Sequence, residues 1–409
     1  MHSMLNEPKR DLSQEIRVIL VRHGESTYNA QGLYQGSSDA SILTETGRRD
    51  ARQTGVFLRG LTIDAVYTSP LRRAQATARE LLLAMDPKAD RQSIQVVDQL
   101  RETDMPAWQG LSFQYIRRRF PAEYRAWKLR PHEFQMAIPQ PEERQEERSG
   151  AVALPTQQWC FPALDLYERI RQFWQATLPQ HAGQTLLLTT HGGTNRALIG
   201  TALGLTSDRY HTIQQSNCGI SVLRFPAADC LSAQLTVMNL TTHLGELLPQ
   251  PKEGGRGLRL LLIPSGANPP AQIQQLATLL KPVTLHFSLS SDLDSCQITA
   301  QQILQHHPGA VQRQVLPETF PFAWRQTIDA IRPGAVSAAA NHQLVTGLVV
   351  ASVAIIKPLL GQTLGLDSDQ LWRLPVQPET LSLVHYPSAE HPPILQGMNI
   401  GEHLSEATR

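Results

Sequence analysis

The chain has 409 residues, of which 41% are hydrophobic and 18% are charged, and its formal net charge is +1. That length predicts two domains, and that composition is typical of a globular protein rather than a disordered one. A net charge so close to zero argues against nucleic acid or an anionic membrane as partners, so any anion-binding site must be local.

Strands and helices are expected to alternate along the first half. Residues 16–21 form an apolar run typical of a buried parallel strand, and 44–58 have the pattern of a helix. Residues 63–69 predict a second strand that runs into a helix. A third strand is expected at 185–193 and a helix at about 195–204. This order predicts a three-layer, doubly wound, mostly parallel α/β sheet, whose ligands bind at the carboxyl ends of the strands.

Two segments between these elements are rich in proline and charge. Residues 131–160 are expected to form an insertion loop, with a lid or wall of the active site as the alternative. Residues 247–257, "LLPQPKEGGRG", have the composition of an interdomain linker.

The second half repeats the first. Residues 197–226 align without a gap onto 358–387, and "VILVRHG" and "SPLRRAQATA" fall opposite "LLLIPSG" and "SDLDSCQITA". Duplication of one α/β unit explains this better than chance. The expected division is an N-terminal tail (1–15), a catalytic domain (16–246), a linker (247–257) and a degenerate second domain (258–409).

The cysteines and the apolar stretches of the sequence indicate in which cellular compartment the protein is expected. Cysteines 160, 218, 230 and 296 are scattered without CxxC spacing, which predicts thiols in a reducing compartment rather than a zinc or disulfide framework. The N-terminal segment lacks the apolar region of a secretory signal, and the apolar stretch 344–356 is too short to span a bilayer. We therefore expect a cytoplasmic protein that does not contact a membrane.

Histidine and arginine follow the expected strands. Arg22 and His23 follow the first strand, Arg72 opens the helix after the second, and His191 follows the third. Arginines and helix N-termini at one sheet edge suit a phosphate, and one imidazole can attack phosphorus while a second, protonated, binds a nonbridging oxygen. Two histidines could instead bind a metal, but two arginines at the same point would repel a cation, so we expect neither a metal nor a cofactor.

Four segments in chain order resemble the histidine phosphatase (phosphoglycerate mutase-like) superfamily: "VRHGESTYN", "YTSPLRRAQATA", "LRETDMPAWQG" and "LTTHGGTNRALI". The resemblance implies that His23 becomes phosphorylated. It also implies a phosphate pocket made by Arg22, Arg72, His191 and Asn29.

A carboxylic acid must protonate the leaving alkoxide. Glu102 matches the position of this acid in the superfamily, and Asp104 is the alternative, since residues two apart on an extended segment point the same way. The superfamily often has glutamate where Gln109 stands, which affects a second, less critical carboxylate.

Other residues are weaker candidates. Arg73 is expected to face solvent, and the run 117–119 is expected to be a solvated helix face, with a contact to a substrate carboxylate as the alternative. Residues 215–217 are candidates for the pocket wall. Further candidates for substrate contact are Gln35, Gly36, Gly192 and His132.

The second copy loses every charged residue of this pocket. His23, Arg22, Arg72 and His191 fall opposite Ser265, Pro264, Asp294 and Ser352. We expect no phosphohistidine chemistry there, and a copy kept for packing, for dimerisation or for shaping the first site.

The expected function is a metal-independent phosphomonoesterase acting through phosphohistidine on a small phosphorylated metabolite, with a sugar-acid phosphate or phosphoserine as the best candidates. A cofactor-dependent phosphoglycerate mutase is one alternative, but it needs extra cations on its lid, and 131–160 carries only Arg144 and Arg148 among five glutamates. A non-catalytic regulatory protein is the other alternative. The sequence leaves open whether two copies of the chain form a homodimer.

Overall fold

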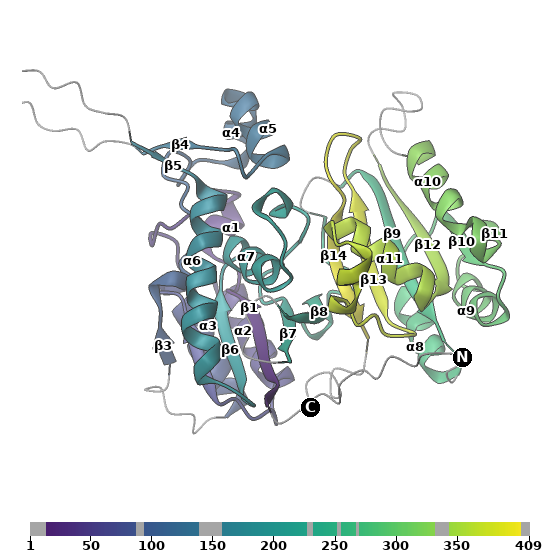
Figure 1. Ribbon diagram of the computed structural model, residues 1–409, viewed down its shortest axis with the longest axis horizontal. Coiled ribbons are helices and arrows are strands. Elements are labelled where there is room, and N and C mark those ends of the chain that lie inside the picture. The colour runs from purple at the N-terminus through teal and green to yellow at the C-terminus, as the bar shows by residue number, and fades with distance from the viewer. Residues whose placement is uncertain are drawn as a thin grey trace, which may run out of the picture.

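The computed structural model describes residues 14–86, 94–138, 158–226, 232–251, 255–266, 270–331 and 343–401. Within these residues both halves contribute to one twelve-stranded sheet (Figure 1). The expected α/β fold with a duplicated unit is confirmed.

The first half supplies six strands in the order β8-β7-β1-β6-β2-β3. The four strands β1, β6, β2 and β3 run parallel, and β7 and β8 form an antiparallel hairpin beside β1. Their bounds are β1 Ile16–Arg22, β2 Ala65–Thr68, β3 Ile94–Val96, β6 Thr185–Thr190, β7 Ile220–Phe225 and β8 Gln234–Leu240.

The second half supplies the same arrangement in the order β14-β13-β9-β12-β10-β11. Again four strands are parallel and a hairpin lies beside them. The bounds are β9 Gly257–Ser265, β10 Phe287–Ser291, β11 Val311–Val315, β12 Leu344–Ser352, β13 Leu381–Tyr386 and β14 Ile394–Ile400.

Helices cover both faces of the sheet (Figure 1). In the first half they are α1 Thr27–Gln31, α2 Glu45–Phe57, α3 Arg72–Met85, α4 Phe113–Arg119, α5 Pro121–Leu129, α6 Pro162–Thr177 and α7 Gly192–Ala202. In the second half they are α8 Pro270–Leu280, α9 Asp294–Leu304, α10 Phe320–Ile331 and α11 Val353–Leu364.

Strand β1 shows why the sheet is buried on both faces. Val18 and Leu20 pack into a core formed with α6, α7, α10 and α11, whereas Ile19 and Val21 pack into a second core with α2, α3, α8 and α9. A strand whose alternating side chains both enter apolar layers must be apolar on both faces, as residues 18–21 are. Each core extends through both halves of the chain.

Strand register supports the duplication independently of sequence identity. The structure pairs Arg22 with Thr190 between β1 and β6, and Pro264 with Ala351 between β9 and β12. These are the pairs that the sequence alignment places opposite each other. The second copy therefore keeps the backbone of the phosphate-binding edge while its side chains differ.

Strand ends differ slightly from the expectations. The third strand ends at Thr190 and the following helix begins at Gly192, because His191 is its N-cap. Strands β4 (Met136–Ala137) and β5 (Trp159–Cys160) pair at the two ends of the proline-rich insertion. Its centre, 139–157, lies outside the described residues, as does most of the expected tail 1–15.

Among the helices that the structure describes, none has both the length and the apolar character needed to cross a membrane. The expected linker, 247–257, connects β8 to β9, and the two halves remain joined through pairing of β8 with β14. The division into two domains at this linker stays a proposal.

Candidate active site

Two histidine rings face each other where β1 and β6 end. His23 is 1% exposed and His191 is fully buried, and their ring centroids are 5.2 Å apart. Nδ1 of His23 lies 2.7 Å from the carbonyl oxygen of Gly24. Because a carbonyl oxygen only accepts hydrogen bonds, Nδ1 carries the proton, and Nε2 is the nitrogen with a lone pair.

His191 is held neutral by its surroundings. Its Nε2 lies 2.7 Å from Oγ of Ser69, and its buried Nδ1 has no hydrogen-bond partner among the described residues. Burial, and next the positive charge of Arg73, lower the pKa of His191 well below its usual 6.5. An anion placed among these groups would favour the protonated ring.

Arg22 keeps its positive charge in a buried position. The residue is 9% exposed, and its Nη1 donates to the backbone carbonyl of Gln215 at 3.0 Å. Burial lowers its pKa to about 10, against the opposing effect of Glu102, so the guanidinium remains charged at neutral pH.

The structure corrects the prediction about Arg72 and Arg73. Arg72 has a side chain that is 61% exposed and pairs with Asp39, its Nε lying 3.1 Å from Oδ2. Arg73 is fully buried, and its Nη1 and Nη2 donate to the carbonyls of Ser38 and Gly36 at 2.7 and 2.9 Å. Arg73 rather than Arg72 therefore supplies the second buried cation.

The packing of α3 explains this reversal. Its buried face includes Arg73, Thr77 and Leu81, spaced four residues apart. This face turns toward the sheet, and Arg72, about 100° further round the helix, is left at the surface.

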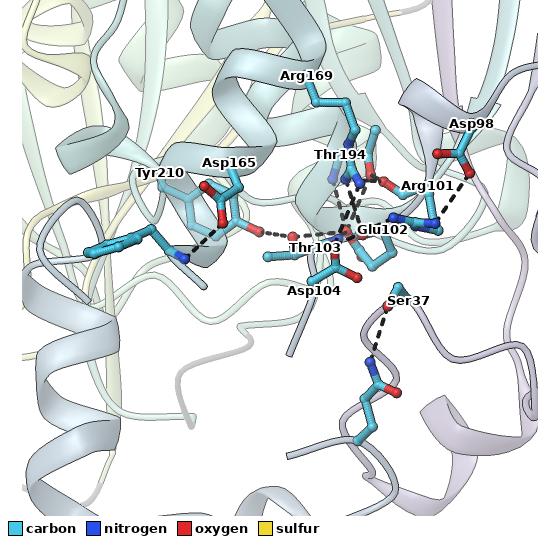
Figure 2. A network of polar contacts seen from close by, with 12 residues as sticks. Ser37, Asp98, Arg101, Glu102, Thr103, Asp104, Asp165, Arg169, Thr194 and Tyr210 are labelled. Atoms are coloured by element: carbon cyan, nitrogen blue, oxygen red, sulfur yellow. Dashed lines mark hydrogen bonds and ion pairs between the residues drawn. The ribbon is translucent and has the colours of Figure 1, made fainter. Parts of the chain in front are cut away.

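Glu102 caps the helix that begins after His191. Its Oε2 accepts from the backbone N–H of Gly193 at 3.0 Å, and its Oε1 accepts from those of Thr194 and Thr103 at 3.0 and 2.8 Å (Figure 2). A carboxylate is favoured at the positive end of a helix dipole. Glu102 also lines the pocket described below.

Asp104, the alternative acid, faces elsewhere. Its Oδ2 lies 3.7 Å from Nη2 of Arg101 and 3.8 Å from Nη1 of Arg169. Asp104 does not line the pocket. The structure therefore favours Glu102 over Asp104.

Close packing requires glycine after the second histidine. A Cβ atom at Gly193 would overlap Glu102 Oε1, Thr103 Oγ1 and the hydroxyl of Tyr210. The same atom at Gly192 would lie 3.2 Å from Nε of Arg22. The two glycines of "HGGT" thus let the helix N-terminus approach the acid and the arginine.

A pocket of about 400 Å³ opens beside these groups. Arg22 and Glu102 line it, together with four further residues expected at the site: Asn29, Gln35, Gly36 and Gly192. Oδ1 of Asn29 accepts from Nδ2 of Asn217 at 3.1 Å, so its NH₂ group is the part available to a ligand. His132 does not line the pocket and instead lies 3.4 Å from Glu133 Oε1, so the structure does not support it as a substrate contact.

The pocket also has a cationic end. Arg117, Lys128 and Arg196 line it around the rings of Tyr124 and Tyr210. Of these residues, the sequence pointed only to the run containing Arg117. Lys128 lies outside the four matching segments, and Arg196 lies within "LTTHGGTNRALI" without standing out there as a ligand-binding residue. Of the expected wall, Gln215 and Asn217 line the pocket and Ser216 does not.

The described residues contain no group of three or more histidine, cysteine, aspartate or glutamate side chains arranged to hold a metal ion. The positively charged side chains that line the pocket are those of Arg22, Arg117, Lys128 and Arg196.

Buried histidines predict a loss of stability in mild acid. Burial lowers the pKa of His243 to about 4, and it lowers the pKa values of His191 and His211 well below 6.5. Below pH 6.5 the unfolded chain binds protons at these positions while the folded chain does not, so the free energy of unfolding falls as pH falls. Each histidine contributes a slope of about 1.4 kcal/mol per pH unit between its folded and unfolded pKa values.

Urea unfolding at pH 7, 6 and 5 tests this dependence. We expect a His243→Gln variant to lose stability less steeply than the wild type, by about 1.4 kcal/mol per pH unit. Equal slopes in the two proteins would show that His243 does not bind a proton on unfolding in this range.

Comparison with known proteins gives several similarities. The family model for the histidine phosphatase superfamily (branch 1) matches residues 18–153 and 139–236. The chain is 34% identical to 2-carboxy-D-arabinitol-1-phosphatase of Triticum aestivum over 218 residues, which are 53% of this chain and 39% of the wheat protein. The chain therefore spans well under half the length of that relative.

Two bacterial relatives match over most of their own length. Phosphoserine phosphatase 1 of Hydrogenobacter thermophilus is 27% identical over 233 residues, 56% of this chain and 95% of that protein. A 2,3-bisphosphoglycerate-dependent phosphoglycerate mutase of Nocardia farcinica is 33% identical over 192 residues, 44% of this chain and 75% of the mutase. All three matches cover about half of the chain.

Proposed function

Because the chain belongs to the histidine phosphatase superfamily, we propose that it hydrolyses the phosphomonoester of a small acidic metabolite through a phosphohistidine at His23. One observation carries this proposal: the buried rings of His23 and His191 face each other beside the guanidinium of Arg22 and the carboxylate of Glu102. The family match supports the reaction class.

The first step transfers the phosphoryl group to the protein. Nε2 of His23 attacks phosphorus, the P–N bond forms, and the P–O bond to the alcohol breaks. Glu102, in its protonated form, gives its proton to the departing oxygen. Arg22, Arg73 and the protonated ring of His191 stabilise the charge on the nonbridging oxygens.

The second step releases phosphate. The carboxylate of Glu102 accepts a proton from water, the water oxygen bonds to phosphorus, and the P–N bond breaks so that Nε2 recovers its lone pair. The Nδ1–H to Gly24 hydrogen bond fixes the ring orientation in both steps.

The cationic end of the pocket points to an acidic substrate. A ligand whose phosphate lies between His23 and Arg22 would extend toward Lys128 and Arg196, and these side chains suit a carboxylate. We therefore propose 2-carboxy-D-arabinitol 1-phosphate as the first candidate substrate, in line with the wheat relative, and phosphoserine as the second.

A panel of phosphorylated metabolites tests the proposal. Phosphate release is measured with and without EDTA from carboxyarabinitol 1-phosphate, phosphoserine, fructose 2,6-bisphosphate and 3-phosphoglycerate. Rapid release from one acidic member, unaffected by EDTA, is the expected result. Release that requires a metal, or none from any member, would contradict the proposal.

A mutase is the second candidate function, favoured by the Nocardia relative. A mutase must retain the phosphoryl group and pass it to a second substrate rather than to water. Incubation with 2,3-bisphosphoglycerate and then with 3-phosphoglycerate separates the two activities. Phosphoryl transfer faster than phosphate release would favour the mutase.

We propose a cytoplasmic location as well. The described cysteines, Cys160, Cys218 and Cys296, are free thiols, as expected for a reducing compartment. A small phosphorylated metabolite is the partner that we propose, without nucleic acid, membrane, metal or cofactor; a homodimer stays a sequence prediction.

The general acid can be identified with a matched pair of variants. Glu102→Gln keeps the shape of the side chain but removes its exchangeable proton, and we expect kcat for an alkyl phosphate to fall by about 10²-fold. The loss should be much smaller for p-nitrophenyl phosphate, whose leaving group needs no proton. Asp104→Asn should stay within about twofold of wild type for both substrates.

Steady-state kinetics with both substrates decides between the two carboxylates. A larger loss in Asp104→Asn than in Glu102→Gln would reassign the acid. An equal loss for the two leaving groups in Glu102→Gln would mean that Glu102 acts only by capping the helix.

A further inference from the structure

The two halves meet through a nearly symmetric seam between β8 and β14, which lie side by side at the centre of the molecule (Figure 1). Asn239 in β8 and Asn399 in β14 both have a φ of 53°. Nδ2 of Asn239 donates to the carbonyl of Gln396 at 2.7 Å, and Nδ2 of Asn399 donates to that of Thr236 at 2.8 Å. The two halves of the chain thus meet in the way that two identical subunits meet about a two-fold axis.

The same seam reaches a wall of the active site, residues 212–217, which we call the substrate wall. Leu395 donates its N–H to the carbonyl of Thr212 at 2.8 Å and accepts from the N–H of Gln214 at 2.9 Å. Nε2 of Gln396 donates to Oε1 of Gln214 at 3.0 Å, and both side chains are buried. The start of β14 therefore fixes both the backbone and a side chain of this wall.

The substrate wall in turn holds the groups that carry the chemistry. The carbonyl of Gln215 accepts from Nη1 of Arg22 at 3.0 Å. Nδ2 of Asn217 donates to the backbone carbonyl of His23 at 2.9 Å. Two hydrogen bonds and a short stretch of the wall thus connect the second half to the proposed nucleophile and to its arginine.

The corresponding edge of the second half is unsuited to phosphate. Oε1 of Glu379, a residue only 5% exposed, accepts from the N–H of Gly266, which stands opposite Gly24 in the duplication. The hydroxyl groups of Ser265 and Thr299 lie 3.2 Å apart where the first half has His23 and Thr77. An acidic edge without arginine would repel a phosphate.

The hairpin of β13 and β14 makes a second contact near the pocket. Oε1 of Glu390, between β13 and β14, lies 3.0 Å from Nη2 of Arg125 in α5, the helix that supplies Trp127 and Lys128 to the pocket. Both charges are exposed, so this pair adds little to stability. It places the hairpin against a second side of the pocket.

We propose that the second half is a built-in partner of the active site, in which Leu395 and Gln396 hold the substrate wall and thereby position Arg22 and His23. Gln396 is a positioning residue that touches no substrate. The kinetic part of this inference rests on the proposed function, whereas its phosphate-binding part does not.

A pair of seam variants tests the inference in the full-length protein. Gln396→Leu keeps the seam filled but leaves Oε1 of Gln214 without its donor. The control, Asn399→Gly, breaks the cross-seam hydrogen bond to Thr236 on the side of the degenerate copy, and glycine tolerates the positive φ there. Gln396→Asn, one methylene shorter, serves as a milder variant if Gln396→Leu does not fold.

Calorimetric binding of inorganic phosphate and steady-state kinetics are measured well below the melting temperature of each variant. We expect Gln396→Leu, or Gln396→Asn in its place, to weaken phosphate binding and to lower kcat/KM by about tenfold, and Asn399→Gly to stay within about twofold of wild type. If both variants lose the same number of degrees in melting temperature and bind phosphate as tightly as the wild type, the inference is overturned. If the wild type hydrolyses no ester but the Gln396 variant still binds phosphate more weakly than the wild type, the inference is upheld and the proposed function is removed.

Discussion

Replacing His23 with alanine is expected to lower kcat/KM for a phosphomonoester by at least about 10⁴-fold, because the variant has no nitrogen to form the P–N bond. The geometry leaves no substitute. The other ring nearby, His191, is held through its Nε2 by the hydroxyl of Ser69 at 2.7 Å, and its centroid lies 5.2 Å from that of His23. The fold should survive, since the strand before His23 is buried by its own apolar side chains.

His132→Ala is the matched control for this variant. It removes a histidine that lies beside Glu133, at 3.4 Å, rather than beside His191, and it should stay within about twofold of wild type. Initial rates with the best substrate of the panel and far-ultraviolet circular dichroism are measured on all three proteins. A folded His23→Ala protein that kept a tenth of the wild-type rate would remove His23 from the chemistry.

Arg73 and Arg72 are expected to differ by about three orders of magnitude. Arg73→Ala should reduce kcat/KM by about 10³-fold, because it removes a buried guanidinium beside the transferred phosphoryl group and two hydrogen bonds that hold the loop at Gly36 and Ser38. Arg72→Ala should cost less than about threefold, since its side chain is 61% exposed and pairs with Asp39.

Arg73→Lys separates the charge of Arg73 from its geometry. Lysine keeps the positive charge but cannot donate in the planar, two-pronged manner of arginine, so an intermediate rate is expected. Inorganic phosphate binding, measured alongside kcat/KM, shows whether the loss is one of ligand affinity. Should Arg72→Ala prove the more damaging of the two alanine variants, the assignment of the buried cation would be reversed.

The strands of the first site were predictable because local sequence specifies them. An apolar run that ends in Arg22-His23 or His191 marks both a buried strand and its carboxyl end, and parallel strands bring those ends together. The duplication was predictable for the same reason. Its strand register is preserved even where Pro264 replaces Arg22.

The choice between Arg72 and Arg73 depended on information that the sequence does not carry locally. Neighbouring residues at a helix start point about 100° apart, and only the packing of α3 on the sheet decides which one is buried. The choice between Glu102 and Asp104 was open for a similar reason. It depends on the N-terminus of α7, about ninety residues further along the chain.

The substrate wall was the least predictable part of the site. Its backbone hydrogen bonds join Gln214 to Leu395, and such pairings across the duplication follow no local pattern. Lys128 lies outside the four matching segments, and nothing in "LTTHGGTNRALI" distinguishes Arg196, so only the packing of α5 and α7 shows that these cations reach the pocket. The insertion loop expected at 131–160, for which a lid was the alternative, has its centre outside the described residues.

Rapid quenching of the reaction with a substrate labelled at phosphorus tests the central claim most directly. The account predicts that, within the first turnover, the label appears on the protein as an alkali-stable, acid-labile phosphoramidate, and that it maps to the peptide containing His23. Label on any other residue, or a burst of free phosphate with no labelled protein, would contradict it.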